Sequence, residues 1–178
     1  LNEKMDEGPI LAQTEVLIRS EENAGELLQR MAQIGAEFLA DTVSRISELT
    51  PKPQNHSEAT YAPLIKKQDG RIDWTEPAIQ INRLVRAFNP WPSSFTFFKG
   101  KRLKILKGCV PDAKFSVPSQ GVPGEILNIS QAGITVACGN ASSYHIEKVP
   151  PENKKPMDAC AYSLGEDMQS GDKFSETP

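Results

Sequence analysis

The stretches Arg71-Ile72-Asp73-Trp74 and Arg86-Ala87-Phe88-Asn89-Pro90-Trp91-Pro92 decide the fold, because they hold both tryptophans of the chain and enclose one short amphipathic segment. Apolar residues recur at helical spacing between them, which predicts a short helix with Thr75 as its N-cap. Its apolar face consists of Ala78, Ile81, Leu84, Val85 and Phe88. Each Trp adjoins an element boundary, where a large ring usually seals a small core, so we expect both rings to be packed inside.

Beyond Pro92 the apolar period changes to every second residue, which is the spacing of β-strands. Five short segments separated by turns have this pattern: residues 95–98, 102–107, 124–129, 133–139 and 143–149. Short strands with turn signals between them predict a small closed sheet, and an OB-like β-barrel is the simplest form of it. We expect this domain to span residues 69–165 and to be followed by a polar tail, residues 166–178.

Residues 1–50 have a different pattern. Residues 9–20 alternate from Thr14 onward and predict a strand with one buried face. Asn23 and Glu26 have the spacing of a capping box, and the apolar stripe after them predicts one bent helix or two abutting helices that end before Pro51. A strand followed by a helix fits the closing unit of an α/β domain, and residues 51–68 are typical of a linker. The predicted fold class is therefore α+β.

Charge is distributed unevenly along the 178 residues, whose net charge is −3. Residues 1–49 carry a net −6, residues 50–114 a net +7 and residues 115–178 a net −4. A basic middle indicates either a surface for a polyanion or an ordinary solvated face, and charge alone leaves both open. The three cysteines are widely spaced, which is untypical of disulfides or a metal site and fits a reducing, cytoplasmic setting. We expect no metal, and no stretch has the length and apolar content of a membrane span.

Taken together, the two Trp-containing stretches resemble the start of the C-terminal domain of methionyl-tRNA formyltransferases. The resemblance is closest over residues 59–107 and extends over 5–50 and 121–174. It implies that residues 1–50 are the C-terminal remnant of a Rossmann-like formyltransferase domain, and that the chain is the later part of a longer polypeptide. The parent would transfer the formyl group of 10-formyltetrahydrofolate to the amino group of initiator methionyl-tRNA. We expect a cytoplasmic monomer that binds neither DNA nor membrane.

The same resemblance implies a catalytic carboxylate in Met5-Asp6-Glu7-Gly8-Pro9. An acidic residue precedes a Gly-Pro-type turn at this place in folate-dependent formyltransferases, so Asp6 would be the catalytic Asp, although Glu7 stays open as the alternative. Such a carboxylate orients a His and stabilises its charged form while an amine attacks the formyl carbon. The Asn and His partners and the folate-binding loop of the family would lie upstream of Asp6, and neither His56 nor His145 replaces them by likeness. We therefore expect the chain alone to be inactive.

Five basic residues are candidates for binding tRNA. Lys67 stands where the family has a basic residue just before its second domain, and the others lie on or beside one hairpin: Lys99, Lys101, Arg102 and Lys104. On a strand, Arg102 and Lys104 point the same way, opposite Leu103 and Ile105, so they predict a phosphate-binding face or ordinary strand amphipathicity. We expect no aromatic side chains among them and hence no base stacking. Lys154 and Lys155 are a secondary basic candidate, and the role of Arg86 stays open between a pair with Asp73 and a contact to tRNA.

Two other functions compete with this interpretation. An amino-sugar formyltransferase shares the Asp-Trp and Pro-Trp-Pro patterns, but the basic hairpin and the late segment through Lys155 and Met157 favour tRNA. A non-catalytic RNA-binding barrel is the other alternative, and an Asn and a His upstream of Leu1 would distinguish an enzyme from such a module.

Overall fold

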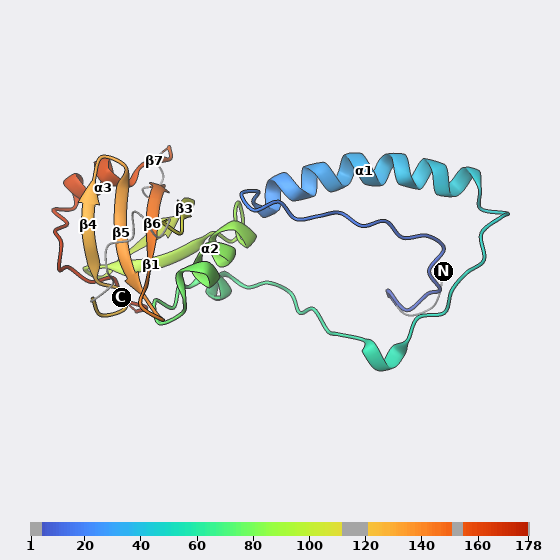
Figure 1. Ribbon diagram of the computed structural model, residues 1–178, viewed down its shortest axis with the longest axis horizontal. Coiled ribbons are helices and arrows are strands. Elements are labelled where there is room, and N and C mark those ends of the chain that lie inside the picture. The colour runs from blue at the N-terminus through green and yellow to red at the C-terminus, as the bar shows by residue number, and fades with distance from the viewer. Residues whose placement is uncertain (1–4, 112–120, 151–154, 178) are drawn as a thin grey trace. The chain divides into compact units, whose positions relative to one another are not determined.

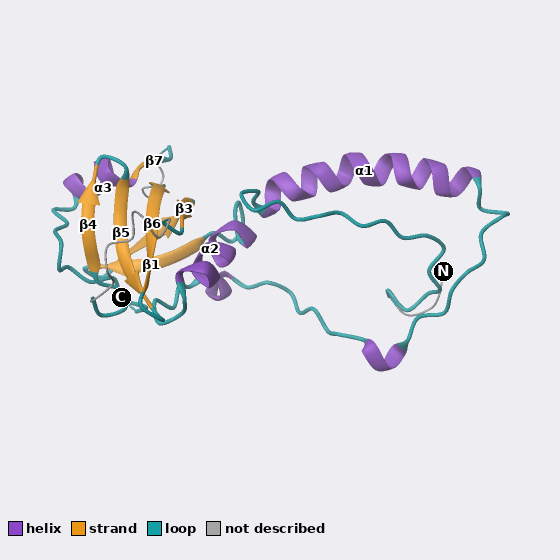
Figure 2. Ribbon diagram, viewed as in Figure 1, coloured by secondary structure: helices purple, strands orange, loops and turns teal. Residues whose placement is uncertain are grey.

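The computed structural model describes residues 5–111, 121–150 and 155–177 and divides the chain into two compact units, residues 1–64 and 65–178 (Figure 1). Among the described residues, every strand belongs to the second unit, as Figure 2 shows. The fold is mixed α+β with antiparallel sheets. None of the described helices combines the length and apolar content that crossing a bilayer requires.

One long helix, α1 (Ala24–Ser44), dominates the first unit. The predicted capping box is confirmed, because the Asn23 side chain accepts from the Glu26 amide at 3.0 Å and the Glu26 carboxylate accepts from the Asn23 amide at 2.9 Å. Gly35 does not interrupt the helix. The Glu22 carboxylate binds both Nε and Nη2 of Arg30 and also accepts from the Arg19 amide, which ties the segment before α1 to its second turn.

The strand predicted over residues 9–20 is wrong for this structure. The segment forms a single antiparallel bridge, in which Ile10 and Lys52 exchange hydrogen bonds of 2.9 Å, and otherwise makes no ladder. A segment with alternating apolar residues forms a strand only where a neighbouring strand pairs with its backbone N–H and C=O groups. The described part of the first unit contains no such neighbouring strand. No side chain of α1 is buried, so its apolar stripe has no core within this unit.

The second unit begins with the 3-10 helix η2 (Lys67–Gly70) and continues to helix α2 (Ala78–Ala87). The predicted helix is confirmed, with Ala78, Ile81 and Val85 buried. Thr75 is not its N-cap. Asp73 Oδ1 instead accepts from the amide and hydroxyl of Thr75, at 2.8 and 2.6 Å, and forms a turn ahead of the helix. The Ser142 hydroxyl accepts from the Ala78 amide at 2.9 Å and so satisfies the first turn from a distant strand.

Seven strands follow α2 among the described residues. Two form a hairpin, β1 (Ser94–Phe98) and β2 (Lys101–Ile105), around the predicted turn Lys99-Gly100, where both residues have positive φ. The other five form an antiparallel sheet in the order β3-β6-β5-β4, with β7 paired to β6. Their bounds are β3 (Lys107–Cys109), β4 (Ile126–Ser130), β5 (Gly133–Cys138), β6 (Ser142–Val149) and β7 (Met157–Asp158).

The last residues differ from the polar tail expected from sequence. After helix α3 (Ala159–Gly165), the chain runs between β4 and β1. The Phe174 amide donates to Gly124 O at 2.8 Å, and Ser175 and Phe97 exchange two hydrogen bonds of 2.9 Å. On the other side, the Leu106 amide reaches Lys148 O of β6 at 3.0 Å, which links the hairpin to the larger sheet. Hydrogen bonds thus run in a circuit through both sheets and the C-terminal segment.

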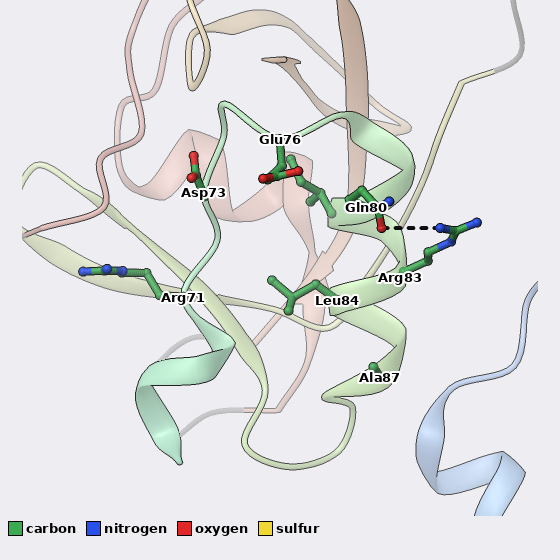
Figure 3. Close-up of a pocket in the computed structure, with 8 residues that line it drawn as sticks. Arg71, Asp73, Glu76, Gln80, Arg83, Leu84 and Ala87 are labelled. Carbon is green, nitrogen blue, oxygen red and sulfur yellow. Dashed lines mark hydrogen bonds between the residues drawn. The ribbon is translucent and has the colours of Figure 1, made fainter. Parts of the chain in front are cut away.

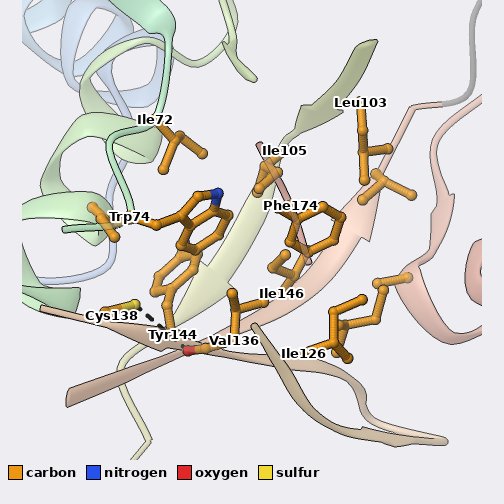
Figure 4. Close-up of a cluster of buried hydrophobic side chains, with 14 of the residues drawn as sticks. Ile72, Trp74, Leu103, Ile105, Ile126, Val136, Cys138, Tyr144, Ile146 and Phe174 are labelled. Carbon is orange, nitrogen blue, oxygen red and sulfur yellow. Dashed lines mark hydrogen bonds between the residues drawn. The ribbon is translucent and has the colours of Figure 1, made fainter. Parts of the chain in front are cut away.

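The core of the second unit lies inside this circuit, and Figure 4 shows its centre. Trp74 is 3% exposed and stacks on Phe174, with ring centroids 5.7 Å apart, while its indole nitrogen donates to Thr96 Oγ1 at 2.9 Å. Phe174, 1% exposed, also meets the edge of Phe98 at 5.8 Å. The prediction of a buried Trp74 is confirmed. That for Trp91 is wrong, because 58% of its surface is exposed.

Candidate functional site

Asp6 and Glu7 lie in the first unit, on a turn that a distant side chain holds. Asp6 has a positive φ of 60° and an exposed side chain. The Gln54 amide nitrogen donates to the backbone oxygens of Asp6 and Gly8, at 2.8 and 2.7 Å, and so ties the turn to the predicted linker. An open hollow of about 430 Å³ lies beside the turn, and His56 is among its lining residues. The fold thus brings His56 to the same hollow as Asp6 and Glu7. The sequence did not predict this, because His56 lies far from both carboxylates along the chain.

The basic hairpin divides into two parts that differ in their partners. Lys99 and Lys101 reach the residues that follow α3: Lys99 Nζ donates to Asp167 O at 3.3 Å, and Lys101 Nζ pairs with Glu166 Oε2 at 2.9 Å. Arg102 and Lys104 alternate with the buried Leu103 and Ile105, so they point outward as predicted. The outward pair therefore presents its charge on the face of β2 away from the core.

Aromatic side chains share that outward face, and the expectation that they would not is wrong. In the hairpin register Phe95 lies opposite Lys104, and Phe97 lies opposite Arg102. Directly opposite residues of an antiparallel pair point to the same side of the sheet. The Arg102 guanidinium lies over the Phe95 ring, 3.6 Å from its centroid, and the Phe95 and Phe97 rings meet edge to face at 5.8 Å. The two-residue turn Lys99-Gly100 fixes this register. The sequence alone could therefore have predicted that Phe95 and Phe97 lie on the basic face.

The other basic candidates lie elsewhere in the second unit. Lys67 opens η2 with an exposed side chain, and Lys155 is exposed ahead of β7. Lys154 lies outside the described residues. Arg86 lies near Tyr144, whose pKa is raised by burial and drawn the opposite way by the Arg86 charge. Asp73, the side chain suggested from sequence as a partner of Arg86, has its pKa lowered chiefly by the hydrogen bonds from Thr75.

An open cleft of about 480 Å³ lies between residues 71–76 and α2, and sequence reasoning missed it (Figure 3). Leu84 of α2 lies in the middle of the cleft, and the carboxylates of Asp73 and Glu76 lie at one end. Arg71 lines the wall that faces α2. Arg83 points away from it and donates to Gln80 at 3.4 Å. No group of three or more potential metal-binding side chains gathers anywhere in the described part of the chain.

Antiparallel sheets that enclose a Trp-centred core, with a basic outward strand, define a small C-terminal β-domain. Residues 64–166 match the family model of the formyl transferase C-terminal domain, and the chain belongs to this family. It is homologous to methionyl-tRNA formyltransferase. It is 39% identical to that of Alkaliphilus oremlandii over 97% of this chain and 54% of that protein, and 40% identical to that of Jannaschia sp. over 94% and 52%. The chain thus spans about half the length of the curated relatives it matches.

Solved structures of HypX from Aquifex aeolicus share this fold. A substituted variant has a TM-score of 0.65 at 18% identity, covering 97% of this chain and 30% of HypX. HypX in complex with tetrahydrofolic acid has a TM-score of 0.61 at 19% identity, covering 93% and 28%. At such identities the likeness concerns the fold alone.

Proposed function

We propose that this chain is the tRNA-holding part of a methionyl-tRNA formyltransferase, whose whole length formylates the amino group of initiator methionyl-tRNA with 10-formyltetrahydrofolate. The observation that carries the proposal is the homology to methionyl-tRNA formyltransferases along almost the whole chain. Residues 1–50 would close the catalytic domain, residues 51–68 would link it to the next, and residues 69–165 would form an OB-like barrel. The circuit of hydrogen bonds through both sheets supports the barrel and extends it to residue 175.

In this proposal the second unit holds tRNA through the outward face of β2. Arg102 and Lys104 would contact phosphates, and Lys67 would add a flexible point charge at the start of the domain. Lys99 and Lys101 belong to the same basic set, but their contacts with Asp167 and Glu166 compete with phosphate. Because phosphate contacts act mainly through counterion release, the binding would depend strongly on salt and little on sequence.

Asp6 would be the catalytic carboxylate, with Glu7 beside it as the alternative. The hollow next to them is open and lined by two loop segments whose side chains are exposed or half-buried, so it does not enclose a folate ring system. The co-substrate would therefore be held by the part of the relatives that this chain does not match. The working enzyme would be a cytoplasmic monomer, with no need of DNA or a membrane.

A chimera tests the proposal. This chain would replace the corresponding part of the methionyl-tRNA formyltransferase of Alkaliphilus oremlandii, and formyl transfer to methionyl-tRNA would be measured. We expect the chimera to be active, its Asp6→Asn variant to lose most of the activity, and the 178-residue chain alone to have none. A folded chimera that formylates a nucleotide amino sugar but not methionyl-tRNA would overturn the proposal. A chain that transfers formyl groups on its own would overturn the assignment of the catalytic groups.

A further inference from the structure

The loop between α2 and β1 holds Trp91 in solvent while its own backbone is fixed. The Asn89 side chain donates to Leu106 O at 2.9 Å, the Ser93 amide donates to Phe88 O at 2.8 Å, and the Ser93 hydroxyl donates to Pro90 O at 2.9 Å. Between these anchors 58% of the Trp91 surface is exposed, whereas Trp74 is 3% exposed. An exposed Trp ring gains no free energy from burial in the folded chain. Because the loop that carries it is already fixed, little conformational entropy is lost when a partner covers the ring.

Basic residues flank this loop on two sides. On one side, a Cβ at Gly70 would lie 2.4 Å from Ser93 O, so η2 touches the Trp91 loop backbone to backbone. The residues that open this turn, Lys66 and Lys67, are both exposed. On the other side, Asn89 anchors the loop to Leu106, just beyond the end of β2, where Lys104 faces outward. The loop that carries Trp91 is therefore joined on each side to a segment with exposed basic residues: Lys66 and Lys67 on one side and Lys104 on the other.

We propose that Trp91 stacks on an unpaired base of bound RNA, while Lys66 and Lys67 attract its phosphate. Every nucleobase offers a π-face to an aromatic ring, and lysines beside such a ring draw in the backbone. The net charge of +7 over residues 50–114 favours a polyanion over a protein surface as the partner. The inference rests on the proposed tRNA-binding function and adds to it a contact with single-stranded nucleotides, which a duplex cannot make because its bases are already stacked on one another.

Tryptophan fluorescence of the full 178-residue chain tests this contact, because the two Trp residues differ so strongly in exposure. The chain is titrated with a short single-stranded RNA and with a fully paired RNA duplex of the same length. We expect the single strand to quench the emission and the duplex to leave it nearly unchanged. Trp91→Leu should abolish the quenching and weaken single-strand binding about tenfold, and Trp91→Phe should retain most of the affinity.

The controls separate this inference from the function on which it rests. Leu164 on α3 is a matched exposed apolar residue, 78% exposed, and Leu164→Ala should change neither titration. Duplex binding and its salt dependence should survive in Trp91→Leu, since they come from the basic strand. If Trp91→Leu binds the single strand as well as the unchanged chain, the inference is overturned and tRNA binding stands. If the unchanged chain binds neither RNA, the Trp91 contact and the proposed tRNA-binding function are both overturned. If the emission is quenched by the N-terminal half of a related formyltransferase and not by RNA, Trp91 contacts protein and the inference is overturned.

Discussion

The Arg102 guanidinium carbon lies 3.6 Å from the centroid of the Phe95 ring, on the outward face of the β1–β2 hairpin. Because the ring covers one face of the planar guanidinium, the Arg102 side chain is held with few of its usual rotamers. Phe95 is in turn only 6% exposed, and the guanidinium of Arg102 and the ring of Phe97 both contact it. The stack gives the basic face one preorganised cation among flexible ones.

Replacing Arg102 tests whether the fixed position of its guanidinium, and not only its positive charge, contributes to tRNA affinity. Arg102→Lys keeps the positive charge but loses the planar stack, so we expect tRNA affinity to fall about threefold, and Arg102→Ala to lower it about tenfold. Binding curves with initiator and elongator tRNA measure both. The two tRNAs should lose affinity alike, because phosphate contacts carry no sequence information. Equal affinities of Arg102→Lys and the unchanged chain would show that charge alone suffices.

Lys101 and Lys104 form a matched pair on the same strand. The Lys101 ammonium pairs with Glu166 at 2.9 Å, so part of its charge is already compensated. Each lysine that meets a phosphate of a paired region contributes about −0.9 to the log–log salt slope. We expect Lys104→Ala to reduce the slope by about that amount, and Lys101→Ala by less. Glu166→Gln should strengthen tRNA binding, since it frees Lys101 and removes a repelling charge. Salt titrations that give identical slopes for both lysine variants would contradict this.

Phe174 should be essential to the stability of the second unit. Its ring stacks on Trp74 and meets the edge of Phe98, so Phe174→Ala leaves a large void at the centre of the core. Core Phe→Ala changes cost about 3–5 kcal/mol in free energy of unfolding. Urea denaturation followed by Trp fluorescence measures the loss. The exposed Glu176 supplies the control, and Glu176→Ala should change stability by less than about 0.5 kcal/mol. A mild effect of Phe174→Ala would mean that the C-terminal segment is dispensable.

The thiols of Cys109, Cys138 and Cys160 should react in an order set by burial. Cys138 is 3% exposed and burial raises the pKa of its thiol to about 12, whereas Cys109 and Cys160 are partly exposed. The thiolate is the reactive form, so iodoacetamide should alkylate the partly exposed Cys109 and Cys160 and leave Cys138 protected in the folded chain. Mass spectrometry of iodoacetamide-treated protein checks this. Alkylation of native Cys138 at the rate of Cys160 would contradict the burial.

Local patterns in the sequence were enough for several elements, since short-range physics sets them. The apolar spacing between the two Trp-containing stretches produced α2, and the Asn23–Glu26 pair produced the start of α1. Lys99-Gly100 produced the β1–β2 hairpin, because a two-residue turn at positive φ holds two antiparallel strands in one register. The outward direction of Arg102 and Lys104 followed from strand alternation alone.

The sequence by itself determined the mixed α+β class, the short helix, the hairpin and the family, because each depends on neighbours close in the chain or on a long matching motif. Only the tertiary structure decided where residues distant in sequence meet. It buried Phe174 between Trp74 and Phe98, left Trp91 outside, and gave residues 9–20 no strand partner. Burial of a ring and pairing of a strand depend on which surfaces come together in space, and local periodicity does not contain that information.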